Sequence, residues 1–273
     1  MPVATHPGTG APLWRRRTPR GDLLAWGAWL LIVAATVAAA RAISDATIWE
    51  FALDAPRQGA DLLARSFPPN LAYANALWRP LWDTVAIATL GTVGAVVLAV
   101  PLAFLAARNT TPSVLVARPL ALFVIVATRS INSLIWALLL VVVLGPGALA
   151  GTVAIALRSI GFVAKLLYEA VEETDPKQVE AIWATGATPA QRLAWGIAPQ
   201  VMPTLAGVSV FRWDINIREA TVLGLVGAGG IGVQLEASVA VLAWPQVATI
   251  LLLILATVLA SEWVSARVRA AVT

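Results

Sequence analysis

The chain has 273 residues, of which 59% are hydrophobic and only 12% are charged. Its mean hydropathy is +0.80, and its formal net charge is +4, from 19 basic and 15 acidic residues. A soluble domain carries about 25% charged residues, so this composition excludes a protein that is covered by water on all sides. The sequence therefore predicts an all-α integral membrane protein.

Long apolar stretches predict six membrane-spanning helices. Charge-free runs at 84–107, 130–157 and 237–261 each supply the roughly 20 residues that cross a bilayer as a helix. The third span is long enough to be kinked near Arg129 and Ser130. We expect the six spans at 22–43, 83–107, 116–144, 147–167, 200–226 and 245–266.

The basic residues predict a cytoplasmic N-terminus under the positive-inside rule. With six spans, the N-terminal tail, the segment at 180–199 and the C-terminus then share the side with more basic residues. That side holds Arg15, Arg16, Arg17, Arg20, Arg108, Arg118, Lys165, Lys177, Arg192, Arg267 and Arg269, and the other side holds Arg41, Arg57, Arg65 and Arg79. Both termini are therefore expected in the cytoplasm.

A long outer segment, 44–82, follows the first span. Apolar and charged residues are interspersed in it, which predicts amphipathic helices that lie on the membrane surface. We expect these helices to break at Pro56 and at Pro68-Pro69. A lid, a platform for an external protein and an inert interfacial helix all remain open as its role.

Four arginines lie well inside the predicted spans, and only Asp214 and Glu219 accompany them at similar depth. A charge at mid-bilayer costs at least about 2.5–3.5 kcal/mol, so such residues usually face a bundle interior or an aqueous path. Asp214 and Arg218 are four residues apart and can pair on one helical face. Arg212 and Glu219 are seven apart and lie nearly in line along the same helix.

Even with both pairs formed, Arg129 and Arg158 keep their positive charges without a partner. A path lined in this way favours an anion, because a guanidinium fork matches the oxygens of a phosphate or phosphonate group. The neighbouring Ser130 and Ser159 would add hydroxyl donors. The alternative is that these arginines form structural ion pairs. The predicted substrate path comprises Arg129, Ser130, Arg158, Ser159, Arg212, Asp214 and Arg218.

A polar segment at 180–199 interrupts the apolar pattern. Gly186 breaks its first half, and Thr188-Pro189 supplies a capping hydroxyl followed by proline in the first turn of a second helix. We therefore expect a short helix, a turn and another short helix, a shape that suits a part pushed by a soluble motor. The alternative is a plain polar loop.

A glycine-rich segment follows the fifth span and fits the pattern G-x-G-x-x-G. A dinucleotide site would need a βαβ unit of about 30 residues and an acidic residue about 20 positions further on, whereas Glu236 follows too soon. We instead expect a helix-ending turn near the outer face that helps to form a gate. Its residues are Gly227, Gly229, Gly230 and Gly232. The sequence also lacks the phosphate loop G-x-x-x-x-G-K-[ST], so the chain is not expected to hydrolyse ATP itself.

At 180–199 the chain resembles the permease subunits of bacterial ABC importers. Their cytoplasmic loop carries Glu-Ala-Ala, three residues, Gly, and a Pro thirteen residues after that Gly. The matching residues are Glu180, Ala181, Gly186 and Pro199, and the departures are Ile182, Gly196 and Ala198. Over roughly 75–270 the chain is similar to the phosphonate-type branch of these permeases, through LWRPLWDT (77–84), AFLAARN (103–109), RSIG (158–161) and REATVLGLVGAGGIG (218–232).

The resemblance implies a six-span ABC importer permease bundle of type I, with a methionine-importer-like core, that forms a homodimer. The implied parts are a cytoplasmic tail at 1–21, the first span with the outer segment at 22–82, and a permease core at 83–273 with a coupling loop at 168–199. The implied function is ATP-driven import of phosphonate, phosphite or phosphate across the bacterial inner membrane.

The resemblance also implies the partners. These are a second copy of the chain, two ATPase subunits bound through the coupling loop, an extracytoplasmic substrate-binding protein and membrane lipid, with no nucleic acid. The chain itself would bind no cofactor, because ATP and Mg belong to the ATPase subunits. It would be a transport subunit and not an enzyme.

Three alternatives remain. An amino-acid importer permease would share the architecture and carry purely structural arginines. A membrane enzyme acting on lipid phosphates would need a nucleophile or a metal cluster, yet His6 is the only histidine and cysteine is absent. An ATP-independent channel or secondary carrier would need no coupling segment.

Overall fold

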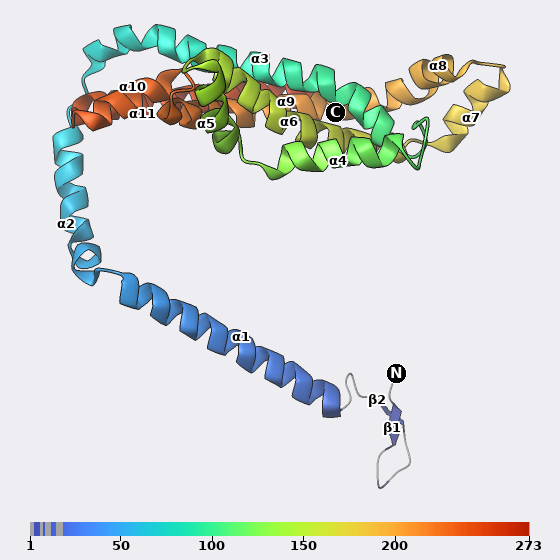
Figure 1. Ribbon diagram of the computed structural model, residues 1–273, viewed down its shortest axis with the longest axis horizontal. Helices are drawn as coiled ribbons and strands as arrows, with labels where there is room; N and C mark the ends of the chain where they lie inside the picture. Colours follow the sequence, from blue (N-terminus) through green and yellow to red (C-terminus); the bar gives the residue numbers. More distant parts are fainter. Residues whose placement is uncertain (1–2, 6–7, 9–11, 15–18, 273) are drawn as a thin grey trace. The chain divides into compact units, whose positions relative to one another are not determined.

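The computed structural model describes residues 3–5, 8, 12–14 and 19–272 (Figure 1). Three arginines used for the orientation prediction, Arg15, Arg16 and Arg17, lie outside these residues, as does His6. The chain forms two compact units, Met1–Leu62 and Leu63–Thr273. Each unit is described by itself.

The first unit contains a short antiparallel strand pair and one long helix. The strands are β1 (Val3–Thr5) and β2 (Pro12–Trp14), and the helix is α1 (Pro19–Ala46). α1 covers the predicted first span and is long and apolar enough to cross a membrane, and no described residue in its apolar window is buried. A helix that is apolar on all sides suits a lipid environment.

Helix α2 (Trp49–Ser66) begins in the first unit and ends in the second. The predicted break at Pro56 is wrong, because the helix continues through it. Proline removes one backbone hydrogen bond, but the alanine and leucine residues around it are strong helix formers. α2 ends just before Pro68 and Pro69, as predicted, and none of its described residues is buried.

Helix α6 lies at the centre of the second unit. It packs against α3, α4, α5 and α9, while α11 packs against α9 and α10 (Figure 1). The helices are α3 (Ala74–Ala106), α4 (Ala117–Ser130), α5 (Ser133–Leu144), α6 (Ala148–Glu172), α7 (Pro176–Ala184), α8 (Pro189–Gln191), α9 (Ala198–Leu223), α10 (Ile231–Ala240) and α11 (Trp244–Val272), with short turns of tighter or wider helix at Leu71–Tyr73, Arg192–Ile197 and Gly224–Val226.

The predicted six-span helical architecture is confirmed. Within the described residues, five helices are long and apolar enough to cross a membrane, and the pair α4–α5 gives a sixth span if it is counted as one. Several elements differ from the prediction. α3 begins at Ala74 rather than at 83, α6 continues to Glu172 so that 168–172 is helix rather than loop, and α10 was not expected.

The third span is broken rather than kinked. α4 and α5 meet at an angle of 89°, directly after the Arg129-Ser130 position where the sequence placed a kink. Asn132 starts the new helix, because its side chain accepts a hydrogen bond from Leu134 N at 3.1 Å. Residues at this break line a cavity together with residues of α6 and α9.

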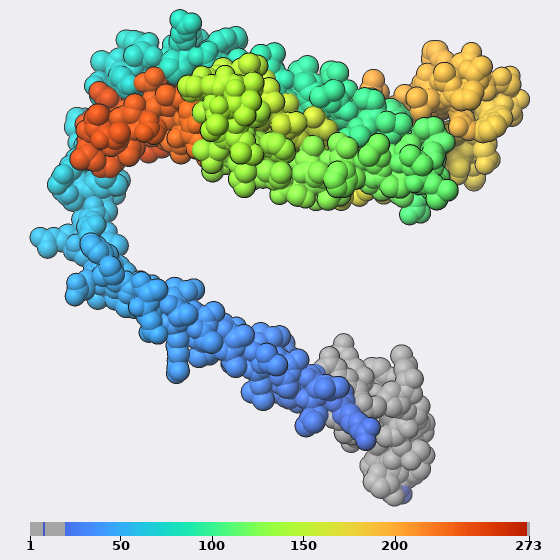
Figure 2. Space-filling model, in the orientation of Figure 1, coloured from blue at the N-terminus to red at the C-terminus, as the bar shows by residue number. Residues whose placement is uncertain are grey.

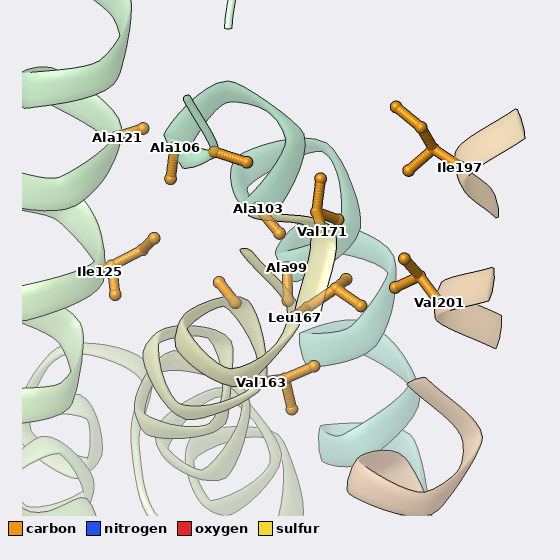
Figure 3. Packing of buried hydrophobic residues seen from close by; sticks show 12 residues of the cluster. Ala99, Ala103, Ala106, Ala121, Ile125, Val163, Leu167, Val171, Ile197 and Val201 are labelled. Atoms are coloured by element: carbon orange, nitrogen blue, oxygen red, sulfur yellow. The ribbon is translucent and has the colours of Figure 1, made fainter. Parts of the chain in front are cut away.

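Small residues allow the helices of the core to approach closely (Figure 3). Ala99, Ala103 and Ala106 of α3 are fully buried against α6. At Gly91 of α3, an added Cβ would lie 2.7 Å from Ile155 Cγ2. Packing through small residues is how helices associate in a membrane, where lipid is as apolar as the side chains.

Candidate functional site

A cavity of about 540 Å³ lies beside the break between α4 and α5. Asn132 and Ser133 line it from the break, Arg158 from α6, and Arg218 and Glu219 from α9. The rest of the lining is apolar. The fold therefore gathers charged side chains from two helices at the break in a third.

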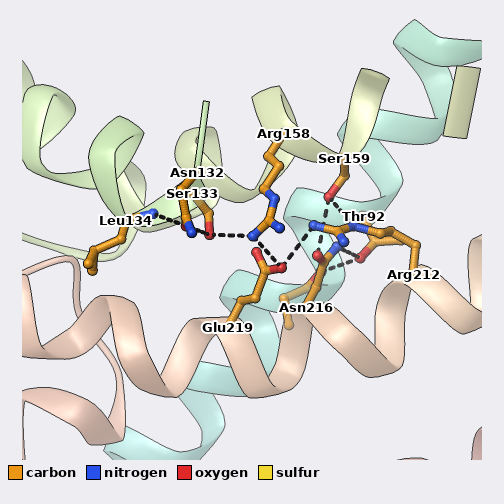
Figure 4. Close-up of polar contacts among 10 residues, drawn as sticks. Thr92, Asn132, Ser133, Leu134, Arg158, Ser159, Arg212, Asn216 and Glu219 are labelled. Carbon is orange, nitrogen blue, oxygen red and sulfur yellow. Dashed lines mark hydrogen bonds and ion pairs between the residues drawn. The ribbon is translucent and has the colours of Figure 1, made fainter. Parts of the chain in front are cut away.

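One carboxylate, that of Glu219, holds two arginines beside this cavity (Figure 4). Its Oε1 lies 2.8 Å from Arg158 Nη1 and 3.2 Å from Arg212 Nη2. Arg158 Nη1 also donates to Ser133 Oγ at 3.2 Å. The Arg212 side chain is 4% exposed and that of Arg158 is 31% exposed. Arg212 is thus fixed in the interior, while Arg158 reaches the cavity.

Arg212 continues into a chain of buried hydrogen bonds (Figure 4). Its Nε donates to Ser159 Oγ at 2.9 Å, and that hydroxyl donates to Asn216 Oδ1 at 3.2 Å. Asn216 Nδ2 donates to Thr92 Oγ1 at 2.8 Å. Unpaired polar groups are costly in an apolar interior, so this chain holds α3, α6 and α9 in one arrangement behind the cavity.

The second acidic residue, Asp214, anchors Arg218 from one turn earlier on α9. The two side chains form an ion pair, and Asp214 also accepts a hydrogen bond from Ser261 Oγ of α11 at 2.7 Å. The carboxylate is almost fully covered, whereas the Arg218 side chain is half exposed. The guanidinium therefore stands on the cavity wall with its carboxylate behind it.

Both predicted pairs within α9 are present, but the expectation that Arg158 lacks a partner is wrong. Glu219 pairs with two arginines, whereas its spacing within α9 predicted a pair with Arg212 alone. The charge balance is nevertheless as expected, because four embedded arginines face two carboxylates. Arg129 has no ion pair within the part of the chain that the structure describes.

The predicted path residues fall into three groups. Two line the cavity, three are buried behind it, and two lie in a second cavity between α4 and α6. In that order they are Arg158 and Arg218; Ser159, Arg212 and Asp214; and Arg129 and Ser130. The predicted role of Ser159 as a donor to cargo does not fit its position, because its side chain is fully buried and its hydroxyl is used by Arg212 and Asn216.

Four polar residues of this network were not predicted, namely Thr92, Ser133, Asn216 and Ser261. Asn216 lies one turn from both Arg212 and Glu219, so a polar stripe at helical spacing on α9 was a usable signal. Thr92 and Ser261 gave no comparable signal, because serine and threonine in helices often bond to their own backbone.

The glycine segment between α9 and α10 forms a tight turn. Gly227, Gly229 and Gly230 have φ angles of 80°, 87° and 78°, in the left-handed region that glycine adopts without steric cost. Gly232 differs from these three, because it lies inside α10 and a Cβ there would come within 2.0 Å of Thr221 O. It is a packing residue, and the helices on both sides rule out a βαβ unit here.

The segment at 180–199 forms the predicted helix, turn and helix. In Figure 2 it is the yellow-to-orange projection at one end of the second unit. Gly186 makes the turn with φ 81°, and its N donates to Trp183 O at 2.9 Å. Thr188 and Gln191 cap α8 reciprocally. Pro199 lies in the first turn of α9.

A groove of about 460 Å³ runs along this segment. Glu180 lines it together with Trp183 and Arg192, whose guanidinium lies 4.5 Å from the centre of the Trp183 ring. Ala181 stands beside Glu180 on α7. Trp183 and Trp195 are 61% and 71% exposed, so the segment presents large apolar side chains that the chain itself does not cover.

Residues 99–270 match the family described as binding-protein-dependent transport system inner membrane component. The chain belongs to this family. The permease is 44% identical over 199 residues to the phosphite transport system permease protein PtxC of Stutzerimonas stutzeri. This match covers 73% of this chain and 72% of that protein. It is 40% identical over 208 residues to the phosphate-import permease protein PhnE of Mycolicibacterium smegmatis. This second match covers 76% of this chain and 39% of that protein.

Solved structures show the same fold. The methionine ABC transporter MetNI, in inward-facing conformations, matches the permease with a TM-score of 0.62 and 22% identity, over 72% of this chain and 96% of that one. An amino acid ABC transporter matches with the same TM-score and 19% identity. The permease is therefore a multi-pass membrane protein with a methionine-importer-like core. Its family implies an ATPase and a substrate-binding protein as partners.

Proposed function

We propose that the chain is the permease of an ATP-driven importer for phosphorus oxyanions such as phosphite, phosphonate or phosphate. The observation that carries this proposal is the excess of guanidinium groups over carboxylates around the cavity at the α4–α5 break. The names of two relatives, a phosphite permease and a phosphate-import permease, support the same class of cargo.

The cavity suits an oxyanion that must shed its water. Arg158 and Arg218 place planar guanidinium groups on the wall, each able to donate two parallel hydrogen bonds to such an anion. Each arginine also has a carboxylate partner, which is Glu219 of the lining for Arg158 and the buried Asp214 for Arg218. These carboxylates compete with the cargo, which keeps binding weak enough for release.

We propose the assembly that the family resemblance implies. Two copies of the chain enclose the path, and two ATPase subunits, which hold ATP and Mg, bind the segment at 180–199. Closure of the ATPases moves this segment and with it α6 and α9, which opens the path alternately to each side. The chain is then a transport subunit without catalytic residues, in the bacterial inner membrane with both termini in the cytoplasm. A substrate-binding protein delivers cargo from the other side.

Uptake into proteoliposomes tests the cargo. The chain is reconstituted with its ATPase and binding protein, and ATP-driven uptake of phosphite and phosphate is compared with that of methionine. We expect transport of the phosphorus oxyanions only. Uptake of methionine alone would assign the chain to amino-acid importers, and uptake without the ATPase would contradict coupling.

Arg218→Gln is expected to lower oxyanion uptake about tenfold or more, because a hydrogen bond to a charged group contributes about 1.5–3 kcal/mol. Arg218→Lys keeps the charge and should retain more of the uptake. Size-exclusion chromatography of the assembled transporter is the control. If Arg218→Gln disrupts assembly, Arg218 is structural and this part of the proposal is wrong.

Gly186→Pro is expected to uncouple ATP hydrolysis from uptake. Proline cannot adopt the φ angle of 81° at this position, because its ring fixes φ at about −65°. Proline also lacks the N–H that Gly186 donates to Trp183 O. Gly186→Asn is the matched control, because asparagine tolerates the left-handed region. Hydrolysis and uptake are measured in the same vesicles. A normal transport-to-hydrolysis ratio in Gly186→Pro would remove the segment from the coupling mechanism.

A further inference from the structure

The second cavity, of about 430 Å³, lies between α4 and α6. Arg129 and Ser130 line it from α4, and Lys165 and Tyr168 from α6, with three aliphatic side chains of α4 completing the wall. No carboxylate is among these lining residues. The cavity therefore differs from the first one, where Glu219 is part of the lining.

Neither cation is held by a buried partner. Arg129 makes no ion pair or side-chain hydrogen bond to any described residue. Lys165 pairs with Glu169 at 3.1 Å, but these side chains are 37% and 39% exposed, and an exposed pair of this kind contributes at most about 1 kcal/mol. The Tyr168 hydroxyl also has no hydrogen-bond partner in the described chain. Three donors are thus available to a ligand.

Close packing fixes the backbone of α4 at Arg129, whose side chain is exposed at the edge of this cavity. Gly161 of α6 faces α4 so closely that an added Cβ would lie 2.5 Å from Ile125 O and 2.9 Å from Arg129 Cβ. Lys165 follows Gly161 by one turn of α6. The two cations therefore approach the hollow from opposite helices that are held in contact by one glycine.

The second cavity lies closer to the coupling segment than the first. Arg158 and Lys165 are seven residues, or two turns, apart on one face of α6, which is about 10.5 Å along the helix. Arg129 of α4 lies opposite Gly161, between these two positions. The three cations therefore follow the order Arg158, Arg129, Lys165 towards the end of α6 that leads into α7. Arg129, which lies well inside a predicted span, needs an aqueous path rather than lipid around its charge.

We infer that the second cavity is a binding site for a phosphorus oxyanion, which cargo occupies after it leaves the first cavity and before it is released. This inference rests on the proposed function for the identity of the cargo. Arg129 supplies a planar fork, Lys165 a point charge and Tyr168 a hydroxyl donor. The same chemistry would accept the phosphate of an anionic lipid headgroup, so the test must separate these two sources.

The lysines of the chain provide the test. Lys165 and Lys177 are the two lysines of the sequence, and Lys177 is exposed on α7. The complete transporter, in phosphatidylcholine nanodiscs without ATP, is acetylated with inorganic phosphate or with chloride at equal ionic strength. Mass spectrometry quantifies both lysines. Phosphate at ten times its Kd should slow acetylation of Lys165 roughly tenfold through occupancy and leave Lys177 unchanged.

The variants and lipids decide between the outcomes. Arg129→Gln should weaken the protection, whereas Arg267→Gln on α11 should not. Equal acetylation of Lys165 with phosphate and with chloride overturns the inference. If phosphatidylglycerol protects Lys165 and free phosphate does not, the cavity belongs to lipid and the cargo site is refuted. An unprotected Lys165 in a transporter that imports phosphate contradicts this inference alone, while failed uptake of phosphite, phosphonate and phosphate alike contradicts the proposed function.

Discussion

Glu219→Gln is expected to destabilise the permease by about 3 kcal/mol or more. Glu219 is the carboxylate partner of both Arg158 and Arg212, and the Arg212 side chain is 4% exposed. Removal of one partner from a buried ion pair costs about 3–5 kcal/mol, because the remaining charge stays desolvated. The glutamine oxygen still accepts one hydrogen bond, which places the effect at the lower end. Thermal unfolding in detergent measures it.

The controls separate the loss of charge from the loss of a side chain. Glu236→Gln makes the same change at an exposed position on α10 and should leave the unfolding midpoint unchanged. Glu219→Asp keeps the charge on a shorter side chain and should be intermediate. If Glu219→Gln unfolds at the same temperature as the original chain, Arg212 must draw its stability from Ser159 and not from the carboxylate.

Most of the fold followed from apolar runs, because a lipid-exposed backbone must satisfy its own hydrogen bonds and therefore forms helices. The start of α3 did not follow. Arg79 and Asp83 lie before the charge-free run 84–107, but Leu77 is fully buried and the helix already begins at Ala74, ahead of both charges. The position of a helix end depends on packing and on how far long charged side chains extend to reach water. A hydropathy average over the sequence carries no information on either.

Ion pairs within one helix could be predicted, and those between helices could not. The pair between Asp214 and Arg218 follows from a spacing of four residues. The pair between Arg158 and Glu219 joins α6 to α9 across 61 positions of sequence, and no periodicity connects them. For the same reason Lys165, counted as a cytoplasmic flank, was not recognised as a neighbour of Arg129.

Identical local sequence also led to different environments. The tripeptide Arg-Ser-Ile occurs at 129–131 and at 158–160, and both serines were predicted to face the path. Ser130 ends α4 and is exposed, whereas Ser159 lies in the middle of α6 and is fully buried. The difference comes from where each helix ends and from which elements pack on it. A tripeptide sequence determines neither of these.

Gly232→Ala is expected to destabilise the permease by about 3 kcal/mol although it adds a single methyl group. The new Cβ would lie 2.0 Å from Thr221 O and 2.8 Å from Gly224 Cα. These are backbone atoms that cannot rotate away, so α10 must move from α9. Overpacking of this kind typically costs about 1–3 kcal/mol, and a contact with backbone places the effect at the upper end. Thermal unfolding again measures it.

Gly207→Ala is the matched control for this substitution. Gly207 lies within α9, and an added Cβ there has no neighbour within 4 Å. Alanine should be neutral or stabilise the helix by up to about 1 kcal/mol, because glycine is the weaker helix former. The same methyl group should therefore act in opposite directions at the two sites. If Gly232→Ala instead matches Gly207→Ala, α10 does not depend on this contact. If its uptake falls further than its folded fraction, the turn at Gly227–Gly230 acts as a gate that the α9–α10 contact positions.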